Sequence, residues 1–367
     1  MKRKFSLKSF IADNLVAVIF LVITIISIPL SGLSASHIVD DIMTRIGRNA
    51  FLVFALLLPI MAGMGINFGM VLGAMAGQIG LIFAMDWAVS GIQGLIFAAL
   101  LGLPLSIFLG WLAGSILNRA RGREMVTSYI LGFFFNGIYQ FVVLYLFGSI
   151  IPLHNKAISL SRGFGVRNTL NLEPVRQVLD NAVMIRVFGI KLPLLSYALI
   201  IVLCFFIVWF KKTKLGQDMR AVGQNQAVSH SAGIPVEKTR ILSIVISTVL
   251  ACFGQIIFLQ NMGNMNTYNA HDQTGFFAAA AILVGGASLS KASIPNVFVG
   301  VVLLHLMYIV VPMAGQNLFG SANIGEYFRQ FIGYGVIALS LVIHAWRSRR
   351  DSERKRELLR TGSELEV

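Results

Sequence analysis

Long stretches without a charged side chain constrain this sequence more than any other feature. Such runs occur at 14–39, 49–85, 87–118, 125–155, 192–210, 241–271, 273–290 and 292–325. A helix needs about 20 mostly apolar residues to cross a bilayer, so most of these runs can cross at least once. Charged residues make up only 13% of the chain, which is about half of the roughly 25% usual in soluble domains. The sequence therefore predicts an all-α polytopic membrane protein.

Glycine-rich breaks divide the longest runs, for example "GMGINFG" at Gly63–Gly69 and "GGASLSKASIP" at Gly285–Pro295. We predict about ten membrane-spanning helices, near 15–34, 50–65, 67–85, 91–117, 125–148, 193–210, 241–260, 275–288, 295–313 and 329–346. The third and eighth are short and glycine-rich, which is typical of partial helices enclosed by other helices. Glycines recur there in steps of four, at Gly65, Gly69, Gly73 and Gly77. This spacing predicts close packing against a neighbouring helix.

The distribution of Lys and Arg predicts the orientation of the chain, because basic residues concentrate on the cytoplasmic side. It predicts a basic cytoplasmic N-terminus at 1–14, a transmembrane domain at 15–346 and a basic cytoplasmic tail at 347–367. Inside the domain, 149–192 is expected to be a long extracytoplasmic loop and 211–240 a cytoplasmic one. The start of the chain is read as a retained first helix; a cleavable signal peptide is the alternative, for which its apolar run is long.

Motifs for catalysis, metal binding or nucleotide hydrolysis are missing from the sequence. The two cysteines, Cys204 and Cys252, both fall in predicted spans, and the six histidines are scattered. No HExxH, GxSxG or phosphate-loop pattern occurs. The net charge of +14 follows from the predicted topology, so no nucleic-acid partner is expected. We therefore expect a non-enzymatic protein that binds no metal or cofactor itself, with its basic tail meeting anionic lipid.

The polar stretch "TKLGQDMRAVGQNQAVSHSAGIPVEKTR" at Thr213–Arg240 stands out between two apolar runs. Asn225 is placed to cap the start of a short helix, and Gly233 with Pro235 is placed to end it. A helix of about two turns is unstable alone in water and needs a surface to pack on. The pattern fits both a connector lying on its own bundle and a docking helix for a cytoplasmic partner.

This stretch and the span after it resemble the loop-and-helix signature of the ribose and branched-chain amino-acid type permeases of binding-protein-dependent ABC importers. The matching positions are Thr213, Gly216, Arg220, Ala221, Gly223, Asn225, Gly233, Ile234, Val236 and Lys238. Val228 departs, because the family has alanine there, and Ala227 precedes it. Weaker similarity at 62–80, where Asn67 replaces an acidic residue, and at 276–290 extends the resemblance over roughly 50–346.

The resemblance implies a type II ABC-importer permease fold in the inner membrane of a bacterium. It implies that the loop grips a cytoplasmic ATP-binding subunit, which uses ATP and Mg²⁺. The implied coupling residues are Gly216, Arg220, Ala221, Gly223, Asn225, Ala227, Gly233 and Ile234. A second permease, identical or homologous, and an extracytoplasmic solute-binding protein are the other implied partners. The implied cargo is a small polar solute, with a simple sugar or a nucleoside favoured.

Uncharged amides in or beside the spans are the candidates for lining a solute pathway. They are Asn67, Gln78, Asn136, Gln140, Gln255, Gln260 and Asn261. Hydrogen bonding between helices, typically worth about 0.6 kcal/mol per contact, is the alternative and is favoured for any single one. Asn136 and Gln140 lie on one helix face within "FFFNGIYQF", where a stacking and amide site for a sugar or base is one interpretation and aromatic packing the other.

Arginines in the long loop at Ser149–Lys191 are candidate contacts for an acidic binding protein. They are Arg162, Arg167, Arg176 and Arg186. The alternative is that the loop is a lid folded over its own bundle. For the protein as a whole, the alternative function is a secondary transporter driven by an ion gradient. Such transporters commonly carry an ionisable residue inside a span, whereas Asp86 and Asp272 fall at predicted span edges.

Overall fold

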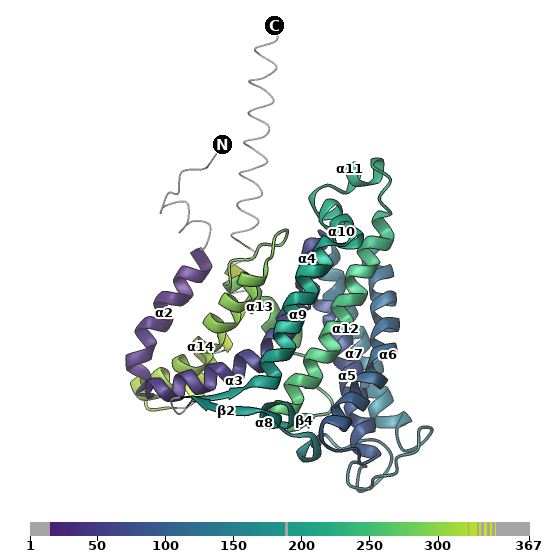
Figure 1. Ribbon diagram of the computed structural model, residues 1–367. Helices are drawn as coiled ribbons and strands as arrows, with labels where there is room; N and C mark the ends of the chain where they lie inside the picture. Colours follow the sequence, from purple (N-terminus) through teal and green to yellow (C-terminus); the bar gives the residue numbers. More distant parts are fainter. Residues whose placement is uncertain are drawn as a thin grey trace.

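The computed structural model describes residues 15–187, 190–321 and 323–328, together with 330–331, 334–335, 338–339 and 342. The predicted basic segments 1–14 and 347–367, and most of the predicted last span at 329–346, lie outside the described residues. In the described part, helices make up nearly all of the regular structure (Figure 1).

Six described helices are long and apolar enough to cross a bilayer. They are Phe68–Asp86 (η1, Phe68–Met70, and α5, Val71–Asp86), α6 (Gly91–Arg119), Glu124–Leu146 (α7, Glu124–Phe141, and the π-helical η2, Val142–Leu146), α9 (Leu194–Lys212), α12 (Val236–Met262) and α14 (Ile294–Phe319). Two shorter apolar helices join them, α2 (Leu15–Ser31) and α13 (Thr274–Val284). The chain is a multi-pass helical membrane protein, as predicted, whereas the number of ten crossings stays a prediction.

The region of the predicted span at 50–65 is not a single helix of its own, and whether it crosses the membrane stays a prediction. It holds the end of α3 (Ala35–Phe54) and the separate short helix α4 (Leu57–Met61). The Ser34 side chain caps α3 by accepting a hydrogen bond from the backbone N–H of His37. The first half of α3 is polar, and its charged side chains find partners: Asp41 forms an ion pair with Arg45, and Asp40 accepts from the backbone N–H of Lys191. The predicted span begins only after these charges, whereas the helix α3 runs through them.

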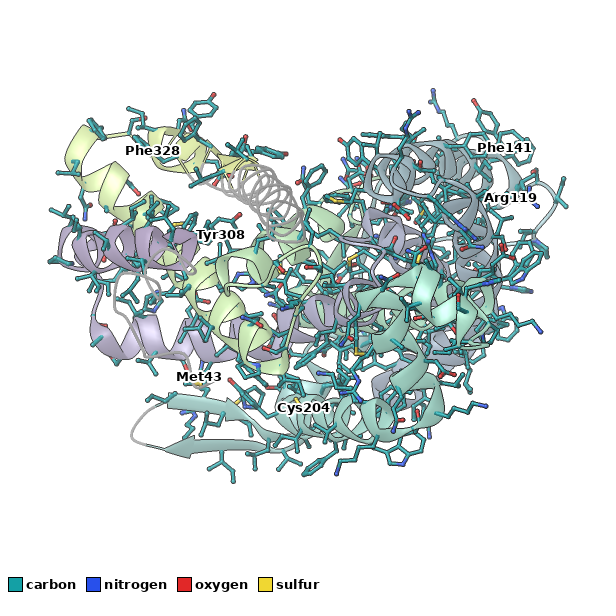
Figure 2. All side chains as sticks on the ribbon, turned by 90° about the horizontal axis from the view of Figure 1, so that it is seen from above. Met43, Arg119, Phe141, Cys204, Tyr308 and Phe328 are labelled. Atoms are coloured by element: carbon teal, nitrogen blue, oxygen red, sulfur yellow. The ribbon has the colours of Figure 1, made fainter. Side chains whose placement is uncertain are left out.

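The helices pack in two groups that meet along α12 and α3. In one group α12 packs on α5 and α6, and in the other α14 packs on α2, α3 and α13. Seen from above, Met43 of α3 and Tyr308 of α14 lie in one half, and Arg119 and Phe141 of α6 and α7 lie in the other (Figure 2). Since α3 contacts both α12 and α14 and crosses the upright helices (Figure 1), it ties the two groups together.

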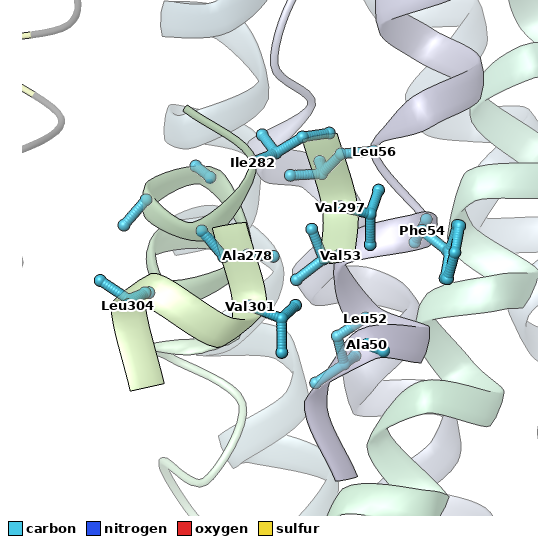
Figure 3. Close-up of a cluster of buried hydrophobic side chains, with 14 of the residues drawn as sticks. Ala50, Leu52, Val53, Phe54, Leu56, Ala278, Ile282, Val297, Val301 and Leu304 are labelled. Atoms are coloured by element: carbon cyan, nitrogen blue, oxygen red, sulfur yellow. The ribbon is translucent and has the colours of Figure 1, made fainter. Parts of the chain in front are cut away.

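A buried aliphatic cluster holds the second group in place. Ala278 and Ile282 of α13 lie beside Val297 and Val301 of α14, with Val53 of α3 close by (Figure 3). All are less than a tenth exposed. The small residues of α13 let it sit inside the bundle as a half-length helix, which agrees with the short segment expected at 275–288.

The glycine series is only partly a packing face. A Cβ on Gly73 would lie 2.0 Å from the Thr248 carbonyl oxygen, and one on Gly77 would lie 2.7 Å from that of Cys252. These two glycines therefore allow α5 to approach α12 closely, as predicted. Gly65 has a positive φ of 71° and serves the turn before α5, and a Cβ on Gly69 would lie nearest Asn67 of the same turn.

The two long loops lie at opposite ends of the bundle (Figure 1). The 213–240 region contains α10 (Lys214–Gln224) and α11 (Gln226–Ser231). The other end carries η3 (Glu173–Val175), α8 (Val178–Ala182) and short strands. There β1 (Thr169–Asn171) pairs antiparallel with β4 (Asn264–Asn266), and β2 (Met184–Val187) pairs antiparallel with β3 (Ile190–Pro193).

Replacing Gly73 by alanine tests the α5–α12 contact. The added methyl cannot fit against the Thr248 carbonyl, so the helices must separate; we expect a loss of about 1–3 kcal/mol of unfolding free energy, typical of overpacking. The matched control is Gly137→Ala in α7, where a Cβ meets nothing within 4 Å. Thermal unfolding in detergent should show a lower midpoint for Gly73→Ala only; equal midpoints would contradict the packing.

Candidate functional site

A cavity of about 240 Å³ opens beside α7, α13 and the turn before α5. A single water needs only about 10–15 Å³ of such space, so the cavity has room for a small solute. Aromatic rings form much of its wall, from Phe68, Tyr129, Phe133, Phe276 and Tyr334. Its polar groups come from Asn136, Asp272 and Gln273. Of the seven amides proposed from the sequence, Asn136 is the one that lines this cavity.

A chain of hydrogen bonds leads from the core to the cavity wall. His271 Nδ1 lies 2.9 Å from Gln78 Oε1, and His271 Nε2 lies 3.1 Å from Asn136 Oδ1. Asn136 Nδ2 donates to Asp272 Oδ1 over 3.2 Å. Gln140 Nε2 adds a bond of 3.3 Å to Asn136 Oδ1. Gln78, Asn136 and Gln140 therefore belong to one network, whose centre is His271.

Burial lowers the pKa of His271 to about 4, so its ring is neutral at pH 7 and carries one N–H. A neutral ring can donate to only one of the two facing oxygens. Gln78 Nε2 is buried and has no hydrogen-bond partner within the described residues. Turning the Gln78 amide so that this nitrogen faces His271 Nδ1 satisfies both groups. Each hydrogen bond in this series, from Gln78 through His271 and Asn136, then has its donor on the side away from Asp272 and its acceptor on the side toward it.

Asp272 closes the chain at the cavity, in the connection between α12 and α13. Its side chain is 41% exposed, and its Oδ1 lies 3.3 Å from His271 Nε2. Partial burial raises the pKa of this carboxyl, because desolvation disfavours its charged form. The sequence reading placed Asp272 at a span edge and gave it no role; only the fold brings it beside Asn136, 136 positions away.

The remaining candidate amides are used within the protein. Gln255 donates to the Ala270 carbonyl over 3.2 Å and accepts from Thr274 over 3.1 Å. Asn67 donates to Ser247 over 3.3 Å. These contacts tie the α12–α13 connection and the turn before α5 to α12. They match the interpretation as bonding between helices, and a role of Gln255 and Asn67 toward solute stays a prediction.

Gln260 and Asn261 lie at a buried carboxylate instead of the cavity. Their side-chain nitrogens donate to Asp180 Oδ2 over 3.2 and 2.8 Å. Ser196 donates to the other oxygen, Oδ1, over 2.7 Å. Arg48 of α3 completes the cluster by donating to Asn261 Oδ1. The cluster fastens α8 to the end of α12, and no sequence pattern announced it because its members are far apart in the chain.

The 213–240 loop has the local structure that its sequence predicts. The Asn225 side chain caps α11 by accepting from the N–H groups of Ala227 and Val228 over 3.0 and 3.1 Å. Gly233 follows with a positive φ of 79°, and Pro235 precedes α12. Gly216 and Gly223 sit where a Cβ would lie 2.1 Å from a neighbouring carbonyl oxygen. They shape the loop rather than present a surface.

The tip of this loop is open. Val228 is 63% exposed, and Ala227, Arg220 and Gly233 are exposed as well. Ala221 and Ile234 are half-buried. Below the tip, Arg240 is buried and donates to Gln226 over 2.9 Å and also to Glu124 of α7. The loop therefore offers a small apolar tip on a firmly anchored base.

The loop at 149–191 is folded onto the bundle. Asp86 at the end of α5 accepts hydrogen bonds from the backbone N–H groups of His154 and Asn155 over 2.7 and 2.9 Å. Arg167 donates to the Ser159 carbonyl, and Arg176 pairs with Glu173. Arg162 and Arg186 are exposed, and their side chains make no hydrogen bond or ion pair within the described residues. The loop thus has features of a lid and leaves two of the four arginines open.

Comparison with known proteins decides the family. A family model described as branched-chain amino acid transport system / permease component matches residues 38–341, most of the chain. The chain belongs to this permease family. The permease is therefore a subunit of the ABC-transporter type, and the resemblance found in its sequence is confirmed.

Named relatives of the permease carry different cargoes. It is 25% identical to the nucleoside ABC transporter permease protein NupB of Lactococcus lactis, over 71% of this chain and 69% of the relative. It is 24% identical to the autoinducer 2 import system permease protein LsrD of Photorhabdus luminescens, over 89% and 94%. It is 23% identical to the ribose import permease protein RbsC of Escherichia coli, over 72% and 75%. No solved structure matches significantly.

Titration of His271 gives the permease a testable acid sensitivity. Its pKa of about 4 in the folded state lies below the ~6.5 of a free histidine, so the unfolded chain binds the proton first. The contribution of neutral His271 to the free energy of unfolding should be fully present above pH 6.5. The free energy of unfolding should fall by about 3 kcal/mol as the pH drops to 4. Unfolding midpoints of wild type and His271→Gln across this range should converge toward low pH. The exposed His37→Gln is the control; parallel curves for wild type and His271→Gln would refute the assignment.

Proposed function

We propose that this permease forms, with a second identical or homologous permease, the pathway of an ABC importer for a small, uncharged polar solute such as a sugar or nucleoside. The observation that carries the solute class is the cavity beside α7. Its aromatic faces can stack on a sugar ring or a base, and its amide and carboxylate groups can hydrogen bond with hydroxyls. The names of the relatives, which include nucleoside and ribose permeases, support the same class.

The proposal assigns ATPase coupling to the 213–240 loop. An ATP-binding subunit would grip the tip at Ala227 and Val228, while Gly216, Gly223, Asn225 and Gly233 hold the tip in shape. Arg220, Ala221 and Ile234 flank it. Support comes from the exposed apolar tip and its anchored base, because a partner can move a bundle only through a part that does not yield. The proposal places the loop and both ends of the chain on the cytoplasmic side of a bacterial inner membrane. ATP and Mg²⁺ would then be used by the partner subunit.

A single charge at the tip should uncouple the ATPase. Val228→Asp places a carboxylate in a contact that would be desolvated, and we expect the ATP-binding subunit to be lost from the complex, with affinity at least 10-fold lower. The measurement is co-purification of the two co-expressed subunits from detergent. Ile150→Asp is the matched control, because Ile150 is an apolar residue at the opposite end that is at least as exposed as Val228.

The outcomes separate the two functions considered for this chain. Loss of the ATPase from Val228→Asp but not from Ile150→Asp supports the coupling role. If both variants keep it, the tip is only a connector. If no ATP-binding subunit co-purifies with wild type, even after crosslinking, a gradient-driven transporter becomes the better account.

The opposite end of the bundle is proposed to receive a solute-binding protein. Arg162 and Arg186 are exposed there and are the main candidate contacts. Arg167 and Arg176 are less suited, because they already bond to the Ser159 carbonyl and to Glu173 within the loop.

Charge reversal tests that assignment. Arg162→Glu combined with Arg186→Glu should slow association of the importer's own solute-binding protein, and the effect should shrink at high salt because exposed charges are screened. Surface binding kinetics at two salt concentrations measure this. Arg121→Glu, at the α11 end, is the control. Unchanged association of the double variant would leave the loop as a lid alone.

A further inference from the structure

Asp272 is the one charged side chain among the described residues that line the cavity. An ionisable group inside a membrane bundle is costly unless it is paired or functional. Asp272 has no Lys or Arg partner in the described part of the chain, and its contact with His271 is no ion pair at pH 7 because that ring is neutral. Its carboxylate also forms no capping bond with α13, which begins two residues later. Neither an ion pair nor a helix cap among the described residues therefore accounts for this carboxylate.

The carboxylate is held by one oxygen and open at the other. Asn136 Nδ2 donates to Oδ1, and His271 Nε2 lies 3.3 Å from that same oxygen. Oδ2 receives no hydrogen bond from the described residues. The side chain remains 41% exposed in a cavity walled by aromatic rings. A carboxylate oxygen that is held in position and has no protein partner among the described residues can accept a hydrogen bond from a donor that enters the cavity.

The groups behind Asp272 keep this geometry rigid. Asn136 is itself bonded to Gln140 and to His271, and His271 faces Gln78 in the core. Next along the chain, Gln273 bonds with the hydroxyl of Tyr334 over 3.3 Å. Specific recognition needs a polar group whose position is fixed before the solute arrives. Asp272 meets that condition, because Asn136 holds its carboxylate and the bond of Gln273 to Tyr334 holds the next residue of the chain.

We propose that Asp272 is the specificity-determining residue of the solute site, accepting a hydrogen bond from a solute hydroxyl through Oδ2 and excluding solutes that carry a carboxylate. This inference rests on the proposed function, because it assumes that the cavity receives solute. Beside apolar aromatic rings the effective dielectric constant is lower than in bulk water, so repulsion between two like charges is stronger there. The site therefore selects uncharged hydroxylated solutes over their anionic counterparts in two ways. The hydrogen bond to Oδ2 attracts a hydroxyl, and the charge of Asp272 repels a carboxylate.

Matched solute pairs test the proposal on the wild-type protein. Galactose with galacturonate, and uridine with uridine 5′-carboxylate, differ by a carboxylate in place of one CH₂OH group. The measurement is equilibrium binding of each to the permease–ATPase complex in nanodiscs, without the binding protein. We expect at least one uncharged member to bind, and its anionic counterpart to bind 10-fold more weakly or worse. Equal binding within such a pair overturns the proposal and leaves the proposed function standing.

Two substitutions separate charge from hydrogen bonding. Asp272→Asn keeps an acceptor and removes the charge, so the preference for the uncharged member should narrow by about 10-fold. Asp272→Ala also removes the acceptor, and affinity for the uncharged member should fall by about 10- to 100-fold, as for a lost bond to a charged group. Asp41→Asn on α3, which removes a charge away from the cavity, should change neither value.

The remaining outcomes are also decisive. If Asp272→Asn leaves the preference unchanged, another group sets it and the proposal is wrong. If no member of either pair binds to wild type, the proposed solute class fails together with the proposal. Because the comparison within each pair needs no variant, a variant that does not fold leaves the test intact.

Discussion

The backbone between α12 and α13 is not helical, yet it enters the interior of the bundle, and its polar groups must find partners there. In a membrane protein such backbone is tolerated only where protein encloses it or it lines a cavity. Side chains provide the partners: Tyr139 donates to the Thr267 carbonyl, Gln140 to that of Tyr268 and Gln255 to that of Ala270. These bonds hold the connection in place, and with it Asp272, the start of α13 and one wall of the cavity.

This constraint explains why amides are so frequent in the spans. A residue such as Gln255 serves the fold by closing a backbone hydrogen bond, and the same chemistry would suit a solute hydroxyl. Sequence alone cannot separate the two uses, because both require an uncharged donor and acceptor at bilayer depth. The structure separates them by position: Gln255 is fully buried against the connection, whereas Asn136 reaches the cavity wall.

Local signals made much of the architecture predictable. The charge-free runs located the long helices, and Asn225 and Gly233 marked both ends of α11, since capping depends on a few neighbouring residues. Features built from distant residues were missed. The helix α3 continues through a polar stretch that holds the ion pair of Asp41 with Arg45, the Asp180 cluster joins four helices, and Asp272 gains its place only when α7 packs beside it. The family followed from the loop signature because that element reads nearly continuously along the chain.

Arg240 gives the molecule a fixed point. It is fully buried, and its bonds to Glu124 and Gln226 join the first turn of α7, the start of α12 and the short helix α11. Separating a buried charge from its partner costs roughly 3–5 kcal/mol, so the contact between the first turn of α7 and the start of α12 resists separation. Since α7 also contributes Tyr129, Phe133 and Asn136 to the cavity, the ion pair of Arg240 with Glu124 fixes the first turn of the helix that forms one side of that cavity.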